Sequence, residues 1–222
     1  MALLVAAGAG ERLGLDRPKA FAELGGRPLL AESLERLDLC PFVDAIVVVA
    51  PAGWEEPVIL LAEELAASKV VSCVTGGATR AESVRVALAD VDMESALVVL
   101  VHDAARPLLS DDVVERVLRP LTEGYDGVVP ALSLPDTVKR VDGGVVVETL
   151  ARESLVGAQT PQAFLAPSLL RAFEGDIEGA TDCASLVERS GGRVAVVEGD
   201  PRLLKVTTAA DLALVERLLA SA

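Results

Sequence analysis

The sequence predicts an α/β protein with a mostly parallel, twisted sheet, helices on both faces of the sheet and one protruding β-hairpin. Short apolar runs rich in β-branched residues alternate with helical patterns along most of the chain. This alternation is typical of strand–helix–strand units around a parallel sheet. The 222 residues, 51% of them hydrophobic, are enough to bury one sizeable core. We therefore expect a single domain over residues 1–222.

The apolar runs that we expect to form strands cover residues 2–7, 45–50, 70–74, 97–102, 127–132, 193–197 and 203–206. The helical patterns cover residues 28–38, 55–68, 79–89, 111–122, 167–173, 181–190 and 208–219. Two of these helices have a start signal. Thr79 with Glu82, and Thr208 with Asp211, have the spacing at which two side chains cap one helix start reciprocally.

One segment interrupts the alternation. Residues 133–155, "SLPDTVKRVDGGVVVETLARESL", contain short polar and β-branched runs around Asp142, Gly143 and Gly144. This pattern predicts a β-hairpin with a tight turn. Because its alternation is too polar for a central strand, we expect the hairpin to project as an arm. Its exposed sheet edges favour a partner subunit as their cover, and a flexible surface flap is the alternative.

Composition and charge exclude several classes of partner. The chain has 34 acidic and 20 basic residues, so its net charge of −14 argues against nucleic acid and anionic membranes. Apolar runs are all too short to span a bilayer, and the first one lacks the basic segment of a secretory signal. Cys40, Cys73 and Cys183 are scattered and show no metal-ligand spacing. We expect a soluble, cytoplasmic protein with reduced thiols.

The glycine-rich stretch "LLVAAGAGERLGLDRPKAF", residues 3–21, favours a phosphate-binding loop. The dinucleotide-binding fingerprint fits poorly, because Gly14 comes one position late and a proline follows soon after. The stretch also lacks the Gly-Lys pair of a P-loop, since Pro18 precedes Lys19. Backbone N–H groups at Gly8 and Gly10 can still bind phosphate oxygens, with Arg12 and Lys19 nearby. A surface loop with solvated charges is the alternative.

A second polar cluster follows another predicted strand, in "VVLVHDAARPLL", residues 98–109. Ligands bind at the carboxyl ends of strands in open α/β sheets. Asp103 at such an end is a hard oxygen ligand that could hold Mg²⁺ directly or through water. We interpret His102 as a structural rather than a catalytic residue.

Eight motifs occur in order along nearly the whole chain: "AAGAGERLG", "RPKAF", "TGGATRAESV", "VHDAARP", "PDTVKR", "AQTPQAF", "ATDCAS" and "LLKVT". This set resembles the 2-C-methyl-D-erythritol 4-phosphate cytidylyltransferases of the non-mevalonate isoprenoid pathway. The resemblance implies a single Rossmann-like α/β nucleotidyltransferase domain with CTP as donor. It also implies Mg²⁺, or another divalent cation, and a homodimer formed through the β-arms.

The resemblance also implies roles for particular residues. Those expected to meet the nucleotide, besides Gly10 of the loop, are Ala6, Ala7, Gly8, Gly77 and Ser83. Those expected to act on the reacting phosphates are Arg12, Lys19, Arg152 and Lys205. Those expected around the sugar phosphate and the metal are Asp103, Ala104, Arg106, Thr137 and Thr160. The chain departs from the pattern at three positions. Relatives usually carry glutamine where this chain has Ala20, and an acidic residue where it has Ala78 and Cys183.

The implied reaction is attack by an acceptor phosphate on the α-phosphorus of CTP, with pyrophosphate leaving. An ionised phosphate needs neither a side-chain nucleophile nor a general base, so catalysis would consist of positioning and charge neutralisation. Ribitol 5-phosphate is the alternative acceptor to methylerythritol phosphate. A non-catalytic module that binds a nucleotide for regulation is the alternative class.

Overall fold

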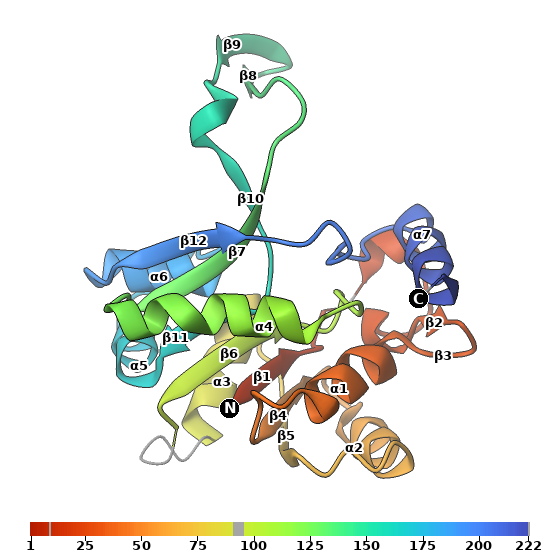
Figure 1. Cartoon of the computed structure of the whole chain (residues 1–222). Coiled ribbons are helices and arrows are strands. Elements are labelled where there is room, and N and C mark those ends of the chain that lie inside the picture. The colour runs from red at the N-terminus through yellow and green to blue at the C-terminus, as the bar shows by residue number, and fades with distance from the viewer. Residues whose placement is uncertain (9, 91–95, 222) are drawn as a thin grey trace.

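The computed structural model describes residues 1–8, 10–90 and 96–221, and its centre is an eight-stranded sheet (Figure 1). Four neighbouring strands run parallel in the order β6 (Val98–Asp103), β1 (Ala2–Val5), β4 (Ile46–Ala50) and β5 (Val70–Thr75). Each was predicted as a strand. Because they are parallel, the residues that follow β1, β5 and β6 meet at one edge of the sheet.

The other part of the sheet is mixed. Its strands are β7 (Gly127–Ser133), β10 (Val156–Ala158), β11 (Gln162–Leu165) and β12 (Val194–Glu198). Strand β11 lies antiparallel between β6 and β7, while β12 is parallel to β7. The sequence predicted neither β10 nor β11, because β10 is only three residues long and β11 has just three apolar residues in succession, too few to show a period.

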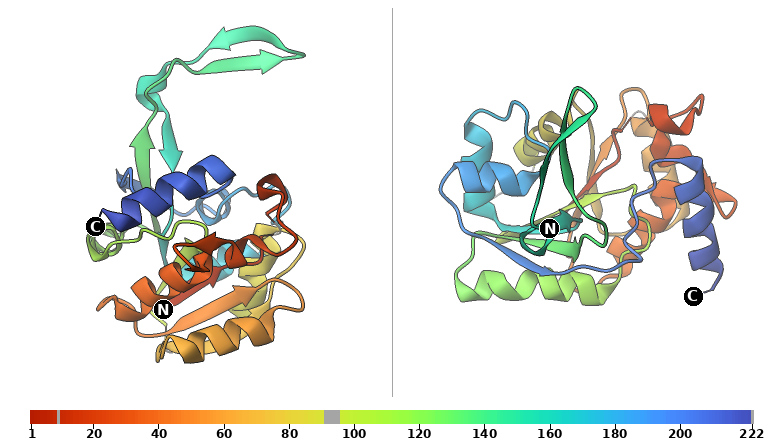
Figure 2. Two further views of the ribbon diagram at one scale, coloured as in Figure 1. Left: turned by 90° about the vertical axis from the view of Figure 1, so that its right-hand side faces the viewer. Right: turned by 90° about the horizontal axis from the view of Figure 1, so that it is seen from above.

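Helices cover both faces of the sheet, as predicted (Figure 2). Successive residues of β1 point to opposite faces, so Leu4 belongs to one core cluster and Leu3 to the other. The first cluster includes residues of α1 (Leu29–Leu39), α2 (Glu55–Glu64) and α4 (Asp111–Leu118). The second includes residues of α3 (Arg80–Asp90), α5 (Ala166–Glu174) and α6 (Cys183–Arg189). The predicted fold class is therefore confirmed.

A third, smaller core cluster brings residues 22–29 together with residues near the C-terminus. Strands β2 (Glu23–Leu24) and β3 (Arg27–Pro28) form a separate pair, and α7 (Ala209–Ala220) lies beside them. The cluster fixes α7 and with it the end of the loop that carries Lys205.

Short 3-10 helices occur at η1 (Glu11–Leu13), η2 (Lys19–Phe21), η3 (Arg119–Glu123) and η4 (Arg152–Ser154).

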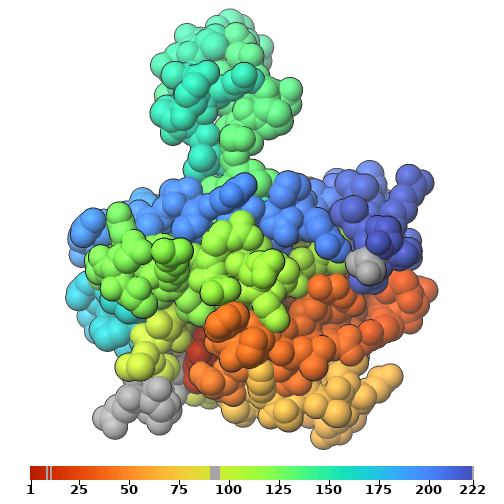
Figure 3. Space-filling view, in the orientation of Figure 1, coloured from red at the N-terminus to blue at the C-terminus, as the bar shows by residue number. Residues whose placement is uncertain are grey.

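The predicted hairpin is present and projects from the body on a narrow neck (Figure 3). Its strands are β8 (Lys139–Asp142) and β9 (Val145–Thr149). Gly143 and Gly144 form the turn with φ of 52° and 83°, the left-handed region that a two-residue hairpin turn of this kind requires. Every residue of β8 and β9 is exposed within the single chain.

Three predicted elements differ from those observed. Residues 203–206 form no strand, although Val206 N donates to Ala105 O at 2.8 Å. Helix α2 ends at Glu64 because Ala66 adopts a φ of 51°. Helix α4 gives way to the 3-10 helix η3, which contains Pro120, a residue without a backbone N–H.

Both predicted capping boxes are present. In the described ranges, no helix has the length and apolar character needed to cross a membrane.

Candidate active site

A cavity of about 270 Å³ opens at the carboxyl ends of β1 and β6, beside the turn between β5 and α3. It brings together residues that lie far apart in the sequence. The predicted site residues that line it are Ala6, Ala7, Gly8, Lys19, Gly77, Ser83, Asp103, Ala104 and Lys205. The location agrees with the rule that open α/β sheets bind ligands at this edge.

Asp103 is the electrostatic centre of the cavity. Its Oδ1 accepts from Nε of Arg80 at 2.9 Å, and its Oδ2 accepts from Nζ of Lys205 at 2.6 Å. Burial alone would raise the pKa of this carboxyl, but the two cations hold the pKa well below its usual range. Asp103 is therefore a carboxylate at any physiological pH.

Arg80 is a site residue that the sequence analysis missed. It lines the cavity from the first turn of α3, and its Nη1 contacts Sγ of Cys183 at 3.6 Å. Among the described residues, its buried Nη2 finds no hydrogen-bond partner. A buried guanidinium N–H without a partner, on a residue that lines the cavity, is suited to an anionic ligand that could approach it. The available signal was an arginine inside "TGGATRAESV", directly after a predicted helix cap.

His102 supports the site from within the protein. Its Nε2 donates to Arg106 O at 3.1 Å, because a carbonyl can only accept, and its Nδ1 therefore accepts from the Thr160 hydroxyl at 3.2 Å. Thr160 Oγ1 in turn accepts from the backbone N of Asp103 at 3.0 Å. Burial lowers the pKa of His102 to about 4, so the ring is neutral near pH 7. This arrangement supports the structural interpretation of His102.

Lys19 enters the cavity from η2, and the glycine-rich loop packs directly against it. A Cβ on Gly10 would lie 2.6 Å from Cβ of Lys19, and Gly10 has a φ of 76°, so this position requires glycine. The pKa of Lys19 is lowered to about 8, chiefly by burial and then by the nearby Lys205 charge. A lysine held in this way gains most from a polyanionic ligand that replaces its lost hydration.

The turn between β5 and α3 closes another side of the cavity. A Cβ on Gly76 would lie 2.3 Å from Cβ of Ala7, so this turn and the first loop touch closely. Gly77 N donates to Oγ of Ser83 at 3.1 Å, and that hydroxyl donates to Thr79 O at 2.9 Å. The turn is thus fixed by a side chain from the helix that follows it.

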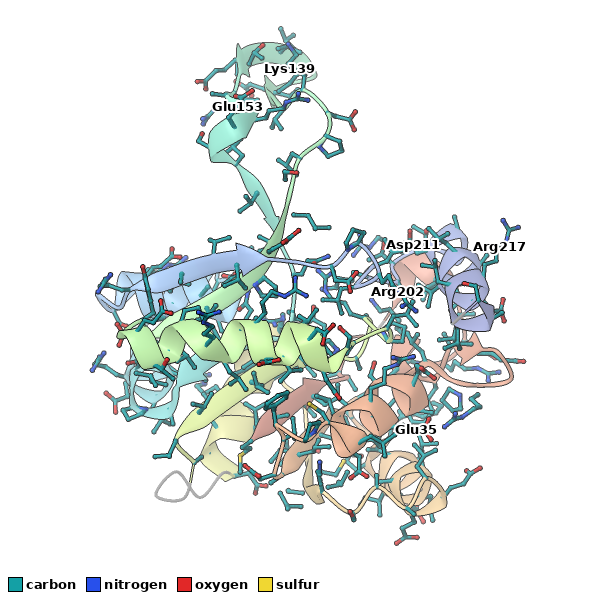
Figure 4. All side chains as sticks on the ribbon, viewed as in Figure 1. Glu35, Lys139, Glu153, Arg202, Asp211 and Arg217 are labelled. Carbon is teal, nitrogen blue, oxygen red and sulfur yellow. The ribbon has the colours of Figure 1, made fainter. Side chains whose placement is uncertain are left out.

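The remaining predicted site residues lie outside this cavity in the single chain. Arg12 is exposed on η1, and Arg106 does not line the cavity but donates from Nη1 to Leu203 O at 2.6 Å. Thr137 and Arg152 belong to the arm, where Nη1 of Arg152 donates to Pro135 O. Figure 4 shows Glu153, the neighbour of Arg152, on that arm, well separated from the body.

The donor set suits a hard divalent cation held partly by substrate. Within the described ranges, no three His, Cys, Asp or Glu side chains gather to hold a metal ion. Among the described residues that line the cavity, Asp103 is the only one with a carboxylate, and that carboxylate is ionised. Mg²⁺ is commonly bound by one or two carboxylates together with waters and substrate phosphates, so a single carboxylate fits such a site.

A Rossmann-like sheet with a cation-lined cavity at its carboxyl edge defines a nucleotidyltransferase of the α/β class. The family model described as IspD, 2-C-methyl-D-erythritol 4-phosphate cytidylyltransferase, matches residues 1–221. The chain belongs to this family, as the resemblance of the eight motifs implied. Cytidylyl transfer from CTP to methylerythritol phosphate is the reaction of the family, whose enzymes generally need a divalent metal.

Individual relatives agree with this assignment. The chain is 46% identical over 220 residues to a protein of this name from Nocardia farcinica, covering 99% of this chain and 93% of the relative. A solved synthase of 4-diphosphocytidyl-2C-methyl-D-erythritol from Anaerococcus prevotii is 27% identical with a TM-score of 0.83, covering 99% and 97% of the two chains. A solved cytidylyltransferase from Thermus thermophilus is 33% identical with a TM-score of 0.79, covering 99% and 98%.

Proposed function

We propose that the cavity binds CTP and methylerythritol phosphate side by side and joins them to give 4-diphosphocytidyl-2-C-methyl-D-erythritol and pyrophosphate. The observation that carries this proposal is the buried Asp103 carboxylate, paired with Arg80 and Lys205 and facing the same cavity as Lys19. Three cations around one carboxylate leave a surplus of positive charge, which suits the phosphates of two substrates.

The cytidine end of CTP would lie between the first loop and the β5–α3 turn. Ala6, Ala7 and Gly8 offer backbone groups on one side, and Gly77 and Ser83 border the other. The hydrogen bonds of Ser83 hold this turn in place. Such a rigid turn can present backbone groups to the amino edge of cytosine without first being ordered.

The triphosphate would extend toward Lys19, with Arg12 on the neighbouring η1 as a second cation. A divalent cation, which we propose to be Mg²⁺, would be held by Asp103 and substrate phosphates, where it would neutralise charge on the triphosphate. Lys19 would bind the phosphate oxygens on which negative charge increases as pyrophosphate leaves. The acceptor phosphate is itself the nucleophile, so the chain only has to hold it in line with the α-phosphorus.

The acceptor would bind on the side of the cavity that Lys205 and Ala104 line, with Thr160 and Arg106 next to it but outside the cavity. We propose that a second copy of the chain completes this site by bringing Thr137 and Arg152 on its arm. The exposed strands β8 and β9 support this homodimer, because such an arm has unpaired edges that a partner can cover. We further propose that residues 1–222 act as one domain in the cytoplasm, which the three free cysteines support.

The experiment that tests the function is pyrophosphate release with CTP and each of two acceptors in separate reactions. We expect rapid release with methylerythritol phosphate and little with ribitol 5-phosphate. Preference for ribitol 5-phosphate would contradict the proposed acceptor. CTP binding without release in the presence of either acceptor would contradict the proposed catalysis in the purified protein.

We predict that CTP is strongly preferred over UTP. UTP reverses the hydrogen-bond sense at the amino edge of the base, so backbone groups of the turn at Gly77 would lose their partners. Each buried group left unpaired costs about 1–3 kcal/mol. The measurement is kcat/KM for both nucleotides at saturating acceptor, and equal values would contradict the placement of the base at this turn.

We also predict that kcat/KM for CTP falls as the pH rises through about 8, the pKa of Lys19 in the folded protein. The Lys19 ammonium is present below this pH and lost above it, so phosphate binding weakens in the alkaline range. Lys19→Arg should lack this decline, because a guanidinium stays charged up to about pH 12. The same alkaline decline in wild type and Lys19→Arg would assign it to another group.

A further inference from the structure

The loop between β12 and α7 carries Lys205 but has no regular secondary structure over residues 199–207. Figure 4 shows this loop at Arg202, between the central sheet and α7. Even so, Nζ of Lys205 lies 2.6 Å from Oδ2 of Asp103. Something outside the loop therefore has to fix its path, because an irregular segment of this length has many alternative conformations.

Gln159 supplies one side-chain anchor of the loop, in addition to the Arg106 guanidinium that donates to Leu203 O. Its Nε2 donates to Asp200 O at 2.9 Å, and Asp200 N donates to its Oε1 at 3.0 Å. Asp200 O also accepts from Leu203 N at 2.9 Å, which closes a turn. The amide of Gln159 thus pairs with both backbone groups of Asp200, as a neighbouring strand would. Only 6% of the Gln159 surface is exposed, so water competes little for these bonds.

The residue before Asp200 shows how closely the loop approaches Gln159. A Cβ on Gly199 would lie 2.3 Å from Oε1 of Gln159 and 3.0 Å from Ala131 O. Real Cβ atoms essentially never approach other atoms to 2.3 Å, and the carbonyl of Ala131 belongs to β7 and cannot easily move. Glycine at position 199 therefore permits the double hydrogen bond.

Thr160, the neighbour of Gln159 in the sequence, holds Asp103, the ion-pair partner of Lys205. Thr160 accepts from the backbone N of Asp103 at 3.0 Å, while Gln159 holds the turn that leads to Lys205. Gln159 itself is fixed to the sheet, because its N donates to Pro130 O at 2.7 Å. Two adjacent residues thus hold the chain near both charged groups: Thr160 at Asp103, and Gln159 at the turn that precedes Lys205.

We propose that Gln159 is a positioning residue of the acceptor site, which fixes the Lys205 ammonium by holding the Asp200 turn. This inference rests on the proposed function, in which Lys205 binds the acceptor phosphate. Gln159 does not line the cavity, so it would act through Lys205 rather than by touching a substrate. Its contribution is to reduce the conformational freedom of Lys205 before the acceptor arrives.

The first test is the kinetics of Gln159→Leu, which removes both hydrogen bonds and keeps similar bulk. We expect kcat/KM for methylerythritol phosphate to fall roughly ten- to hundredfold, the scale for a misplaced group. KM for CTP should change less than about twofold, because the nucleotide meets other segments. Equal losses for both substrates would overturn the inference, since a general disturbance of folding has that result.

A double-mutant cycle with Lys205→Ala separates positioning from general support. If Gln159 acts through Lys205, Gln159→Leu should have little further effect on acceptor kinetics once Lys205 is alanine. Multiplicative losses in the double variant would overturn the inference. If Lys205→Ala alone leaves acceptor kinetics unchanged, the proposed role of Lys205 is wrong, and the inference about Gln159 is wrong with it. This outcome is distinct from multiplicative losses, which contradict only the role of Gln159.

Two further variants guard against a simple folding defect in Gln159→Leu. Gly199→Ala pushes the loop away from Gln159 while leaving that amide intact, and it should show the same selective loss for the acceptor. Arg202→Ala changes an exposed side chain of the same loop and keeps the backbone bonds, so its kinetics should match wild type. A selective acceptor defect in Arg202→Ala, or none in Gly199→Ala, would overturn the inference.

Discussion

Lys19→Ala should lose roughly 10²–10³-fold in turnover, the usual scale for removing one preorganised charge aimed at a transition state. Lys19 lines the cavity and is held there by the close approach of Gly10. Its ammonium is partly desolvated in the free protein, as its lowered pKa of about 8 shows. Removing such a charge should therefore not weaken the fold greatly. Steady-state turnover and thermal unfolding of the variant measure the two effects.

Two matched variants sharpen this prediction. Lys19→Arg keeps the positive charge but replaces a compact ammonium with a planar fork, so turnover should recover only partly. Lys69→Ala removes an equal charge far from the cavity, where Nζ of Lys69 donates to Cys40 O at 2.7 Å, and turnover should stay at the wild-type level. A wild-type rate in Lys19→Ala would exclude Lys19 from catalysis.

The parts of the site that follow strands could be predicted from the sequence. The runs before Gly8 and before Ala104 have clear apolar patterns, and parallel strands bring their carboxyl ends to one edge. The resemblance then identified which side chains at that edge matter. Asp103 and Lys205 are separated by 102 positions in the sequence, yet they form an ion pair. No periodicity predicts that these two residues lie close together. The ordered motifs alone placed both at the same site, and the ion pair itself was not predicted.

Other features could not be predicted because they depend on tertiary contacts. The segment at Leu203–Lys205 has strand-like composition, but Leu203 O accepts from Arg106 and Lys205 Nζ donates to Asp103, so side chains take the place of a neighbouring strand. Arg80 looks like an ordinary residue in the first turn of a helix. Its role emerges only when β6 places Asp103 within 2.9 Å of its Nε. Burial and the unpaired Nη2 are properties of the folded chain, which composition does not encode.

Arg152→Ala and Lys205→Ala should each be nearly inactive alone, and activity should reappear when the two variants share a dimer. Lys205 faces the cavity of its own chain, whereas Arg152 lies on the projecting arm. In the homodimer that we propose, symmetry makes the exchange reciprocal, so each chain lends its Arg152 to the pocket of its partner. A mixed dimer then contains one pocket with both defects and one pocket with neither.

The experiment is to unfold the two variants, refold them together and measure pyrophosphate release. Random assembly makes about half of the dimers mixed, so about a quarter of all pockets should be intact. Native mass measurement confirms that mixed dimers have formed, and each variant refolded alone gives the baseline. If Arg152 served the pocket of its own chain, every pocket in the mixture would carry one defect. Mixed dimers without activity would therefore reject the shared site, because a shared site leaves one pocket of every mixed dimer intact.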